Sequence, residues 1–249
     1  MSDVHQRSTH KLSCGMGQSI AELHRQAFDE AAYWYTIYSA AKVGVLLDSM
    51  LDDSDHSFFG ILTGDKLVAY AHVCRLPEGP HLNYIAVHPE QQGKGLGLAL
   101  LQRVFEHAQV NDVKNLTLHV SKTNSAARRW YAREGFEERS RTSVYLAEPS
   151  QTESNSAKQV SCTWTPEQRA RMRRFGISAF QLSVDESLFE VGVIGDSLYR
   201  LVDTGNQSVV DALAQIEAHR KVVIIDSAGR RPDATVVQID ELLYLVCRL

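Results

Sequence analysis

Cysteine is scarce in this sequence, and no two cysteines form a Cys-x-x-Cys pair. The four thiols lie far apart, at Cys14, Cys74, Cys162 and Cys247. Structural zinc sites and disulfide frameworks both need clustered or regularly spaced cysteines. We therefore expect no metal, and reduced thiols in a cytoplasmic protein.

Long apolar runs and a surplus of basic residues are also missing. No stretch approaches the ~20 apolar residues that span a bilayer, and the first residues are polar rather than an apolar signal. The chain has 26 Lys and Arg residues against 30 Asp and Glu residues, a formal net charge of −4. Nucleic-acid binders usually carry a basic surface that contacts phosphates. We expect a soluble protein that binds neither membranes nor nucleic acid.

The chain has enough apolar material for folded domains, with 44% hydrophobic residues among 249. A tract rich in Ser, Gln, Asn and Thr, within residues 149–160, interrupts this apolar pattern and has few side chains to bury. We expect one domain at residues 15–148, a linker at residues 149–160 and an accessory α/β domain at residues 161–249. A chain that ends near Ser150 should then keep its cofactor site.

Periodicity predicts alternating helices and strands. The first half should contain two helices within residues 19–48, then strands at 57–62, 66–75 and 82–87, a helix at 98–108, a strand at 115–120, a helix at 125–134 and a strand at 141–147. The second half should contain a helix that ends near Gly176, strands at 188–193 and 198–202, a helix at 208–219, and strands at 222–225 and 241–247. The helix at 98–108 connects two strands that should be parallel.

A glycine-rich turn precedes that helix, with Gly93, Gly95 and Gly97 at alternate positions. Free amides and the positive end of the helix dipole make such a turn an anion site. A P-loop needs Lys-Ser or Lys-Thr after the last glycine, where this chain has Leu98 and Ala99. A dinucleotide fingerprint needs a glycine at position 98. The turn therefore suits a pyrophosphate of another cofactor class.

Gln92, Gly95 and Gly97 resemble the acetyl-CoA motif of the GNAT superfamily, Arg/Gln-x-x-Gly-x-Gly/Ala, and the resemblance extends over about residues 15–147. Many members have Arg where this chain has Gln92. The resemblance implies that the CoA pyrophosphate is held by the turn Gln92, Gly93, Lys94, Gly95, Leu96, Gly97 and Leu98. It also implies that the pantetheine arm pairs with the backbone of Ile85, Ala86 and Val87, between two separated parallel strands.

A second block looks like the family's Asn-x-x-Ala-x-x-x-Tyr-x-x-x-Gly-Phe, and it is filled by Asn124, Ala127, Tyr131, Gly135 and Phe136. The resemblance implies that Asn124 and Ala127 contact CoA. It also implies that the Tyr131 hydroxyl lies near the thioester sulfur, where it can protonate the leaving thiolate. A tyrosine with its usual pKa of ~10 suits a proton donor at neutral pH.

The resemblance implies an α/β (α+β) fold, in which a mixed central sheet has a βαβ acetyl-CoA unit, plus a smaller C-terminal α/β domain. It further implies an N-acetyltransferase that moves acetyl from acetyl-CoA to a primary amine of a small molecule or polypeptide by direct attack, with Tyr131 as general acid. The alternative is an acyl-CoA-binding sensor or scaffold without turnover. Transfer of a larger acyl group and a homodimer stay open.

The acceptor side is less defined by the sequence. An amine must lose a proton as it attacks, so a base or an ordered water is needed. The candidates on or beside the central strands are His72, His81, His88, Tyr84 and Glu78, and the sequence does not choose among them. Residues 160–249 lack a second glycine motif, so a second active transferase is not expected. A degenerate half-transferase, a dimerisation module and an acceptor-recognition module remain open for that part.

Overall fold

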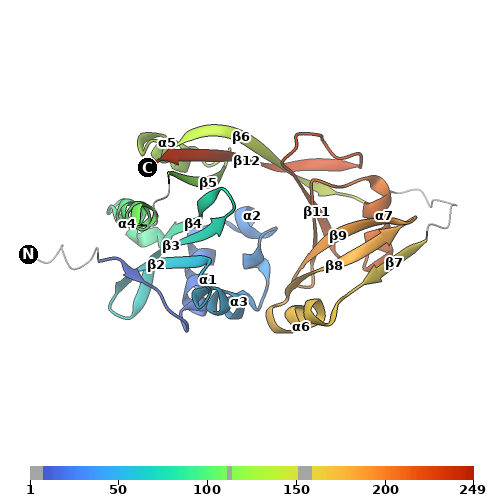
Figure 1. Ribbon diagram of the computed structural model, residues 1–249, viewed down its shortest axis with the longest axis horizontal. Helices are drawn as coiled ribbons and strands as arrows, with labels where there is room; N and C mark the ends of the chain where they lie inside the picture. Colours follow the sequence, from blue (N-terminus) through green and yellow to red (C-terminus); the bar gives the residue numbers. More distant parts are fainter. Residues whose placement is uncertain (1–7, 111–113, 151–158) are drawn as a thin grey trace, which may run out of the picture.

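The computed structural model describes residues 8–110, 114–150 and 159–249. It shows two lobes, one formed by the first half of the chain and one by most of the second half (Figure 1). Strands β6 (Glu137–Ala147) and β12 (Val236–Arg248) run from one lobe into the other. The expected linker falls largely on residues 151–158, outside the described residues, so the domain boundaries remain a prediction.

Helices and strands alternate through both halves. The first half contains β1 (His10–Lys11), α1 (Gly17–Ala27), α2 (Glu30–Tyr33), the 3₁₀ helix η2 (Ile37–Ser39), α3 (Val43–Leu51), β2 (His56–Thr63), β3 (Lys66–Leu76), β4 (Gly79–Val87), the 3₁₀ helix η3 (Pro89–Gln91), α4 (Leu96–Val110), β5 (Asn115–Ser121), α5 (Ser125–Arg133) and β6. The second half contains β7 (Val160–Thr163), α6 (Pro166–Phe175), β8 (Ile177–Val184), β9 (Ser187–Ile194), β10 (Leu198–Val202), α7 (Gln207–Ile216), β11 (Lys221–Asp226) and β12.

Local sequence explains where α6 begins and ends. The Thr165 hydroxyl accepts a hydrogen bond from Gln168 N, and the Gln168 side chain accepts one from Thr165 N. These two bonds satisfy amides that lack partners within the helix. Gly176 ends the helix with a φ of 68°, a conformation that glycine adopts without strain. The predicted end of this helix at Gly176 is confirmed.

The described strands form one mixed sheet in the order β1-β2-β3-β4-β5-β12-β6-β11-β10-β9-β8-β7. β4 and β5 are parallel, as predicted for the strands that flank α4, and β10 and β11 are parallel as well. In each half, an antiparallel strand meander is followed by a helical crossover to a parallel strand. The second half therefore repeats the strand order of the first, and the predicted mixed α/β fold is confirmed.

β12 lies in a different place from the one that the sequence suggests. We expected its residues in the accessory domain, but it pairs with β5 on one side and β6 on the other. The reason is burial: Leu243, Leu245 and Cys247 pack into the core of the first half. In return, residues 143–147 of β6 pair with β11 of the second half. Each half thus completes its sheet with a strand from the other.

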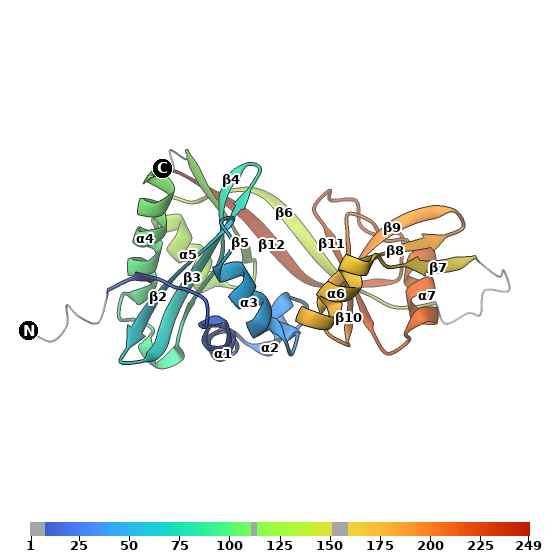
Figure 2. The same ribbon diagram turned by 60° about the horizontal axis from the view of Figure 1, so that its bottom comes forward.

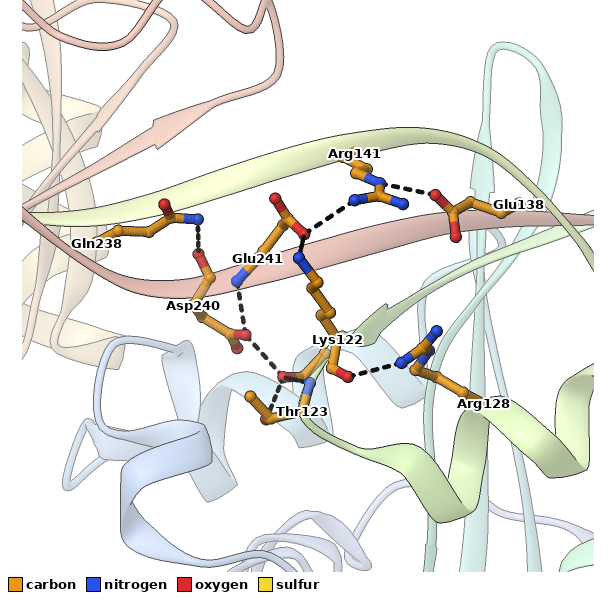
Figure 3. Close-up of polar contacts among 9 residues, drawn as sticks. Lys122, Thr123, Arg128, Glu138, Arg141, Gln238, Asp240 and Glu241 are labelled. Carbon is orange, nitrogen blue, oxygen red and sulfur yellow. Dashed lines mark hydrogen bonds and ion pairs between the residues drawn. The ribbon is translucent and has the colours of Figure 1, made fainter.

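Polar side chains hold β12 against the end of β5 (Figure 3). Glu241 Oε2 lies 2.7 Å from Lys122 Nζ and 3.4 Å from Arg141 Nη1. The neighbouring Asp240 accepts hydrogen bonds from the hydroxyls of Ser121, at 2.7 Å, and Tyr35, at 2.8 Å. Exposed ion pairs contribute only ~0.2–1 kcal/mol each. These contacts therefore fix the register of β12, while its buried apolar side chains stabilise it.

Helices cover both faces of the sheet in the first half. α4 and α5 pack on one face, and α1 and α3 cover part of the other (Figures 1 and 2). In the second half, α7 packs against the sheet around Phe180, Leu182 and Leu213. A further apolar cluster joins the halves, with Tyr35 and Leu46 of the first half against Phe175 and Val223 of the second. The two halves therefore share packing as well as strands.

A buried histidine lies within α1. The His24 ring stacks on the Tyr38 ring, with centroids 3.4 Å apart, and its Nδ1 atom is 2.7 Å from the Tyr70 hydroxyl oxygen. Only 1% of His24 is exposed, and burial lowers its pKa from 6.5 to about 3. The folded protein therefore keeps this imidazole neutral at pH values at which the unfolded chain protonates it.

The protein is expected to lose stability as the pH falls below 6.5. His24 and His72, whose pKa burial also lowers to about 3, each take up a proton only on unfolding in this range. Their contribution to the free energy of unfolding is complete above pH 6.5. It is lost as the pH falls towards 3, by up to about 1.4 kcal/mol per pH unit for each ring. Urea unfolding across this range measures the loss. His24→Gln should lose less stability on acidification than the parent, and an equal loss would contradict a neutral buried His24.

Candidate functional site

The two parallel strands that flank α4 separate along their length. β4 and β5 pair at two positions, His81 with Thr117 and Leu82 with Leu118. Among the described residues, the later residues of β4 have no partner on the β5 side, although residues 84–87 still pair with β3. We call this arrangement the β4–β5 fork, with its vertex at Leu82 and Leu118. It is the place at which the resemblance puts the pantetheine arm.

A bulge sets the direction of the side chains along β4. His72 and Val73 of β3 pair with Tyr84 and Leu82, so Asn83 is the extra residue between them. Bulges re-aim side chains and are common next to active sites. Here the bulge lets both Leu82 and Ile85 face the core under α4 although they are three residues apart. Asn83 therefore lies immediately beside the vertex of the fork.

The three residues expected to pair with the cofactor arm form one side of the fork. Ile85 and Val87 pack towards α4, and Ala86 faces the opposite side of the sheet, where it is 3% exposed. Successive backbone groups of a strand point alternately to its two neighbours. The groups that do not bond to β3 are therefore directed into the fork, as an extended ligand would require.

The glycine turn lies at the open end of the fork. Gly93 and Gly95 have φ angles of 76° and 81°, which glycine adopts without a Cβ penalty. The hydrogen bond from Ala99 N to Gly95 O, at 3.1 Å, closes the first turn of α4. The amides before Ala99 lack partners within the helix and are available to an anion. Gly97 also lies in this first turn. A Cβ atom added to Gly97 would lie 3.6 Å from the Trp130 ring.

Side chains of the turn have different surroundings. Gln92 donates from Nε2 to Val87 O at 3.2 Å, so it ties the turn to the end of β4. Lys94 Nζ lies 2.9 Å from Gln91 Oε1 at the surface. Leu96 is buried in the core under α4, whereas Leu98 is 39% exposed. The side chain of Gln92 is therefore used within the fold, and the turn offers mainly backbone groups to a ligand.

Asn124 stands at the start of α5 and caps it. Its Oδ1 atom accepts a hydrogen bond from Ala127 N at 3.0 Å, which is the usual role of an N-cap residue. Ala127 is half-buried against the core under α4. The oxygen of Asn124 is thus engaged, and its amide nitrogen is the group that a ligand could reach.

Tyr131 lies on α5 and packs into the core between this helix and the sheet. It is 6% exposed and belongs to the same core as Leu82 and Leu118. Its ring is 4.8 Å from the Trp130 ring and 5.4 Å from the Phe136 ring. No group in the described part of the chain hydrogen-bonds to its hydroxyl, and burial raises the pKa of that hydroxyl well above 10. It therefore stays protonated at neutral pH.

The five candidate bases lie in different places. His72 and His81 are buried on the face of the sheet opposite α4, and Tyr84 packs on the same face against Tyr38. His88 instead accepts a hydrogen bond from Glu90 N at the start of η3, and Glu78 is exposed at the β3–β4 turn. The structure brings a further histidine, His119 of β5, to His81, with ring centroids 5.1 Å apart. Sequence analysis missed His119.

The second half has a closed counterpart of the fork. β10 and β11 pair continuously from Leu198 with Lys221 to Val202 with Ile225. Asp203, just after β10, accepts hydrogen bonds from Ser227 N and Oγ at 2.6 and 2.9 Å. These bonds hold the pKa of Asp203 below its usual value, so a negative charge lies at the position where the first half has its glycine turn. The described part of this half therefore offers no equivalent place for a pyrophosphate.

No helix among the described residues is long and apolar enough to cross a bilayer. Within the same residues, His, Cys, Asp and Glu side chains form no group of three that could hold a metal ion.

Comparison with known proteins identifies the family of the first domain. Residues 18–136 match the model of the acetyltransferase (GNAT) family. A tandem GNAT protein from the clavulanic acid biosynthesis pathway has the same fold over 97% of this chain and 98% of its own, with a TM-score of 0.69 and 15% identity. A GCN5-related N-acetyltransferase from Sphaerobacter thermophilus aligns over 97% of this chain and 95% of its own, with a TM-score of 0.64 and 14% identity. No curated protein matches the chain in sequence.

The family match spans the β4–β5 fork, the glycine turn and Tyr131, and the whole-chain likeness extends the shared fold to the second half. Residues 18–136 therefore form a domain of the acetyltransferase (GNAT) family.

Proposed function

We propose that this protein is an N-acetyltransferase that moves the acetyl group of acetyl-CoA to a primary amine of a small molecule or a polypeptide. The family and the fold support acetyl-CoA-dependent acetyl transfer in general. The finer proposal rests on one observation: Tyr131, whose hydroxyl has no hydrogen-bond partner among the described residues, belongs to the same core as Leu82 and Leu118, the vertex of a fork whose open end leads to the glycine turn.

Each part of the fork has a role in this proposal. The amides from Gly93 to Leu98 hold the CoA pyrophosphate, because a helix start carries about half a unit of positive charge and unpaired donors. The backbone of residues 85–87 pairs with the pantetheine arm as an added strand would. Asn124 and Ala127, at the start of α5, contact the arm from the other side. The thioester then lies near the vertex, within reach of Tyr131.

The reaction is direct transfer. The amine nitrogen attacks the thioester carbonyl carbon, so a C–N bond forms and the C–S bond breaks. The leaving sulfur takes the proton of the Tyr131 hydroxyl, which burial has kept protonated, and the amine nitrogen gives its proton to a base. No covalent enzyme intermediate is needed, because both substrates meet in one complex.

A screen for thiol release tests the function. The protein is incubated with acetyl-CoA and a panel of primary amines, namely n-butylamine, spermidine and short peptides with free amino groups. Mass spectrometry then identifies the acetylated product. Acetylation of an amine supports the proposal. Tight acetyl-CoA binding with no turnover on any amine would instead support a sensor or scaffold.

Gly93→Ala is expected to weaken acetyl-CoA binding by at least about ten-fold, or ~1.4 kcal/mol. Alanine is strained at a φ of 76°, so the turn shifts and its amides lose their common direction. Isothermal calorimetry measures the change. Gly64→Ala is the matched control, because Gly64 has a φ of 60°, also has open space around it, and lies in the distant β2–β3 turn. Equal binding by both variants would remove the turn from the cofactor site.

A further inference from the structure

We propose that His119 accepts the proton that the acceptor amine loses during acetyl transfer, and that His81 holds His119 in position for this role. The proposal rests on the proposed N-acetyltransferase function and defines its acceptor side. Two histidines meet at the vertex of the β4–β5 fork, on the face of the sheet opposite Tyr131.

The register of β5 places His119 at the vertex. It directly follows Leu118, which pairs with Leu82 where the two strands separate. Leu118 and Val120 are buried in the core under α4 and α5, and side chains of a strand alternate between its faces. His119 therefore faces away from that core, whereas Tyr131 belongs to it. The two side chains thus lie on opposite faces of the sheet, and the proposal assigns the His119 face to the amine and the Tyr131 face to the sulfur.

Hydrogen bonds fix which nitrogen of His119 is free. The Thr117 hydroxyl donates its one proton to Pro80 O at 3.3 Å, so it accepts from His81 Nδ1 at 2.8 Å. A neutral His81 then has a lone pair on Nε2, and this atom lies 3.3 Å from His119 Nδ1. His119 therefore donates from Nδ1, and its Nε2 lone pair is left to accept a proton. Protonation of Nε2 leaves this chain of bonds unchanged.

The surroundings keep both rings neutral. Burial lowers the pKa of His81 to about 4, with the nearby His119 as a smaller cause, and burial also lowers the pKa of His119. Among the described residues, the titratable rings that contact His119 are His81 of β4 and Tyr244 of β12, each with its ring centroid 5.1 Å away. Part of His119 is exposed, so an amine and water can reach it. A neutral, accessible imidazole can take the proton and pass it to solvent.

His72 is the rival base, and its contacts argue against it. It is fully buried, its Nε2 atom is 3.0 Å from His56 Nδ1, and its Nδ1 atom is 3.3 Å from Asn83 Nδ2. Both ring nitrogens are therefore engaged, whereas His119 has one nitrogen without a partner among the described residues.

The proton balance of the step closes. As the C–N bond forms, the amine N–H proton moves to His119 Nε2 while the electron pair of that N–H bond stays on nitrogen. The C–S bond breaks, and the sulfur takes the Tyr131 proton. The imidazolium of His119 then releases its proton to water, and the Tyr131 oxygen regains one. The net reaction converts amine and acetyl-CoA to amide and CoA.

His119→Ala tests the proposal with the fastest acceptor of the amine panel. We expect kcat/KM for the amine to fall about 100-fold, while the acetyl-CoA Kd, which also reports folding, stays unchanged. The acidic limb of the pH profile should disappear. Free imidazole should raise the rate of the His119→Ala variant at least ten-fold, and more basic imidazoles should raise it further. His119→Gln should lose activity equally, which excludes a packing defect.

Matched variants separate the roles of the other histidines. His56→Gln, on the same face but away from the vertex, should keep kcat/KM within about two-fold. His81→Gln keeps an acceptor for His119 Nδ1 and should retain most of kcat, whereas His81→Leu should lose it, as a positioning residue would.

Three results would overturn the proposal. These are a His119→Ala rate within three-fold of the parent, no rescue by imidazole, or an equal loss in His56→Gln. In each case the parent still acetylates the amine, so the proposed function stands without His119. A parent that binds acetyl-CoA but acetylates no amine would remove the proposed function and this proposal together.

Discussion

Tyr131→Phe is expected to lower kcat by about 100-fold or more, because a positioned general acid contributes ~10²- to 10⁴-fold. The substitution removes one oxygen atom and keeps the ring, which packs against Trp130 and Phe136. Without the hydroxyl, the thiolate leaves unprotonated from a site that burial has made dry. The affinity for acetyl-CoA should change by less than about two-fold, since the proposed contacts to the arm and the pyrophosphate come from other groups.

Single-turnover thiol release measures this effect on the chemical step itself. Tyr199→Phe is the matched control, because Tyr199 is also buried, at 3% exposure, but lies on β10 of the second half. It should keep the parent rate. An unchanged kcat in Tyr131→Phe, with chemistry shown to be rate-limiting, would remove Tyr131 from the mechanism.

A chain that ends at residue 235 is expected to lose the fold of both halves. Without β12, both β5 and β6 are left with an unpaired edge, and Leu243, Leu245 and Cys247 leave the first core. Large-to-small changes in a core already cost ~2–5 kcal/mol each, so the loss of three side chains is as large as the whole stability of a typical domain, ~5–15 kcal/mol. This expectation from the pairing of β12 is the opposite of the one from sequence, in which a chain ending near Ser150 keeps its cofactor site.

Cutting the chain between residues 151 and 158 distinguishes two independent halves from two halves that exchange strands. A protease site introduced there leaves β6 in one fragment and β12 in the other. Because each fragment supplies a strand to the other half, we expect both to elute together in size-exclusion chromatography and to part only in denaturant. Two folded fragments that separate in native buffer would contradict the exchange of strands.

Point substitutions on β12 test how much its buried side chains stabilise the core of the first half. Leu243 is 2% exposed, whereas Val237 on the same strand is 58% exposed. Leu243→Ala should lower the free energy of unfolding by ~2–5 kcal/mol, and Val237→Ala should change it little. Urea unfolding followed by tryptophan fluorescence compares the two.

The proposed cofactor side of the site has sequence signals because those signals are local. The spacing of Gly93, Gly95 and Gly97 and the block from Asn124 to Phe136 each lie within one turn and one helix. In the structure the first signal forms a turn with positive φ angles at Gly93 and Gly95, and the second forms α5 and its N-cap. The structure also shows two hydrogen bonds that the sequence pattern does not predict. Asn124 caps α5, and the Gln92 side chain donates to Val87 O.

The other features depend on pairing between distant segments. Alternation within β12 shows which side chains are buried, but it does not show which core receives them. His119 occupies an ordinary outward position of a strand, and only the register that brings Leu118 to Leu82 puts it at the vertex. The unpredicted strand β8 did carry a usable signal, since Phe180, Leu182 and Val184 are buried at every second position.

The exchange of strands also dictates when the first half can finish folding during synthesis. Ser121 of β5 and its partner Asp240 are 119 residues apart. At ~5–20 residues per second, the ribosome needs roughly 6 to 24 s to synthesise that length of chain. Throughout this time the edge of β5 is open to pairing with other nascent chains, and the edge of β6 is open once that strand has been made. Slower translation should therefore increase aggregation of this protein, and a chaperone that shields strand edges should increase its yield.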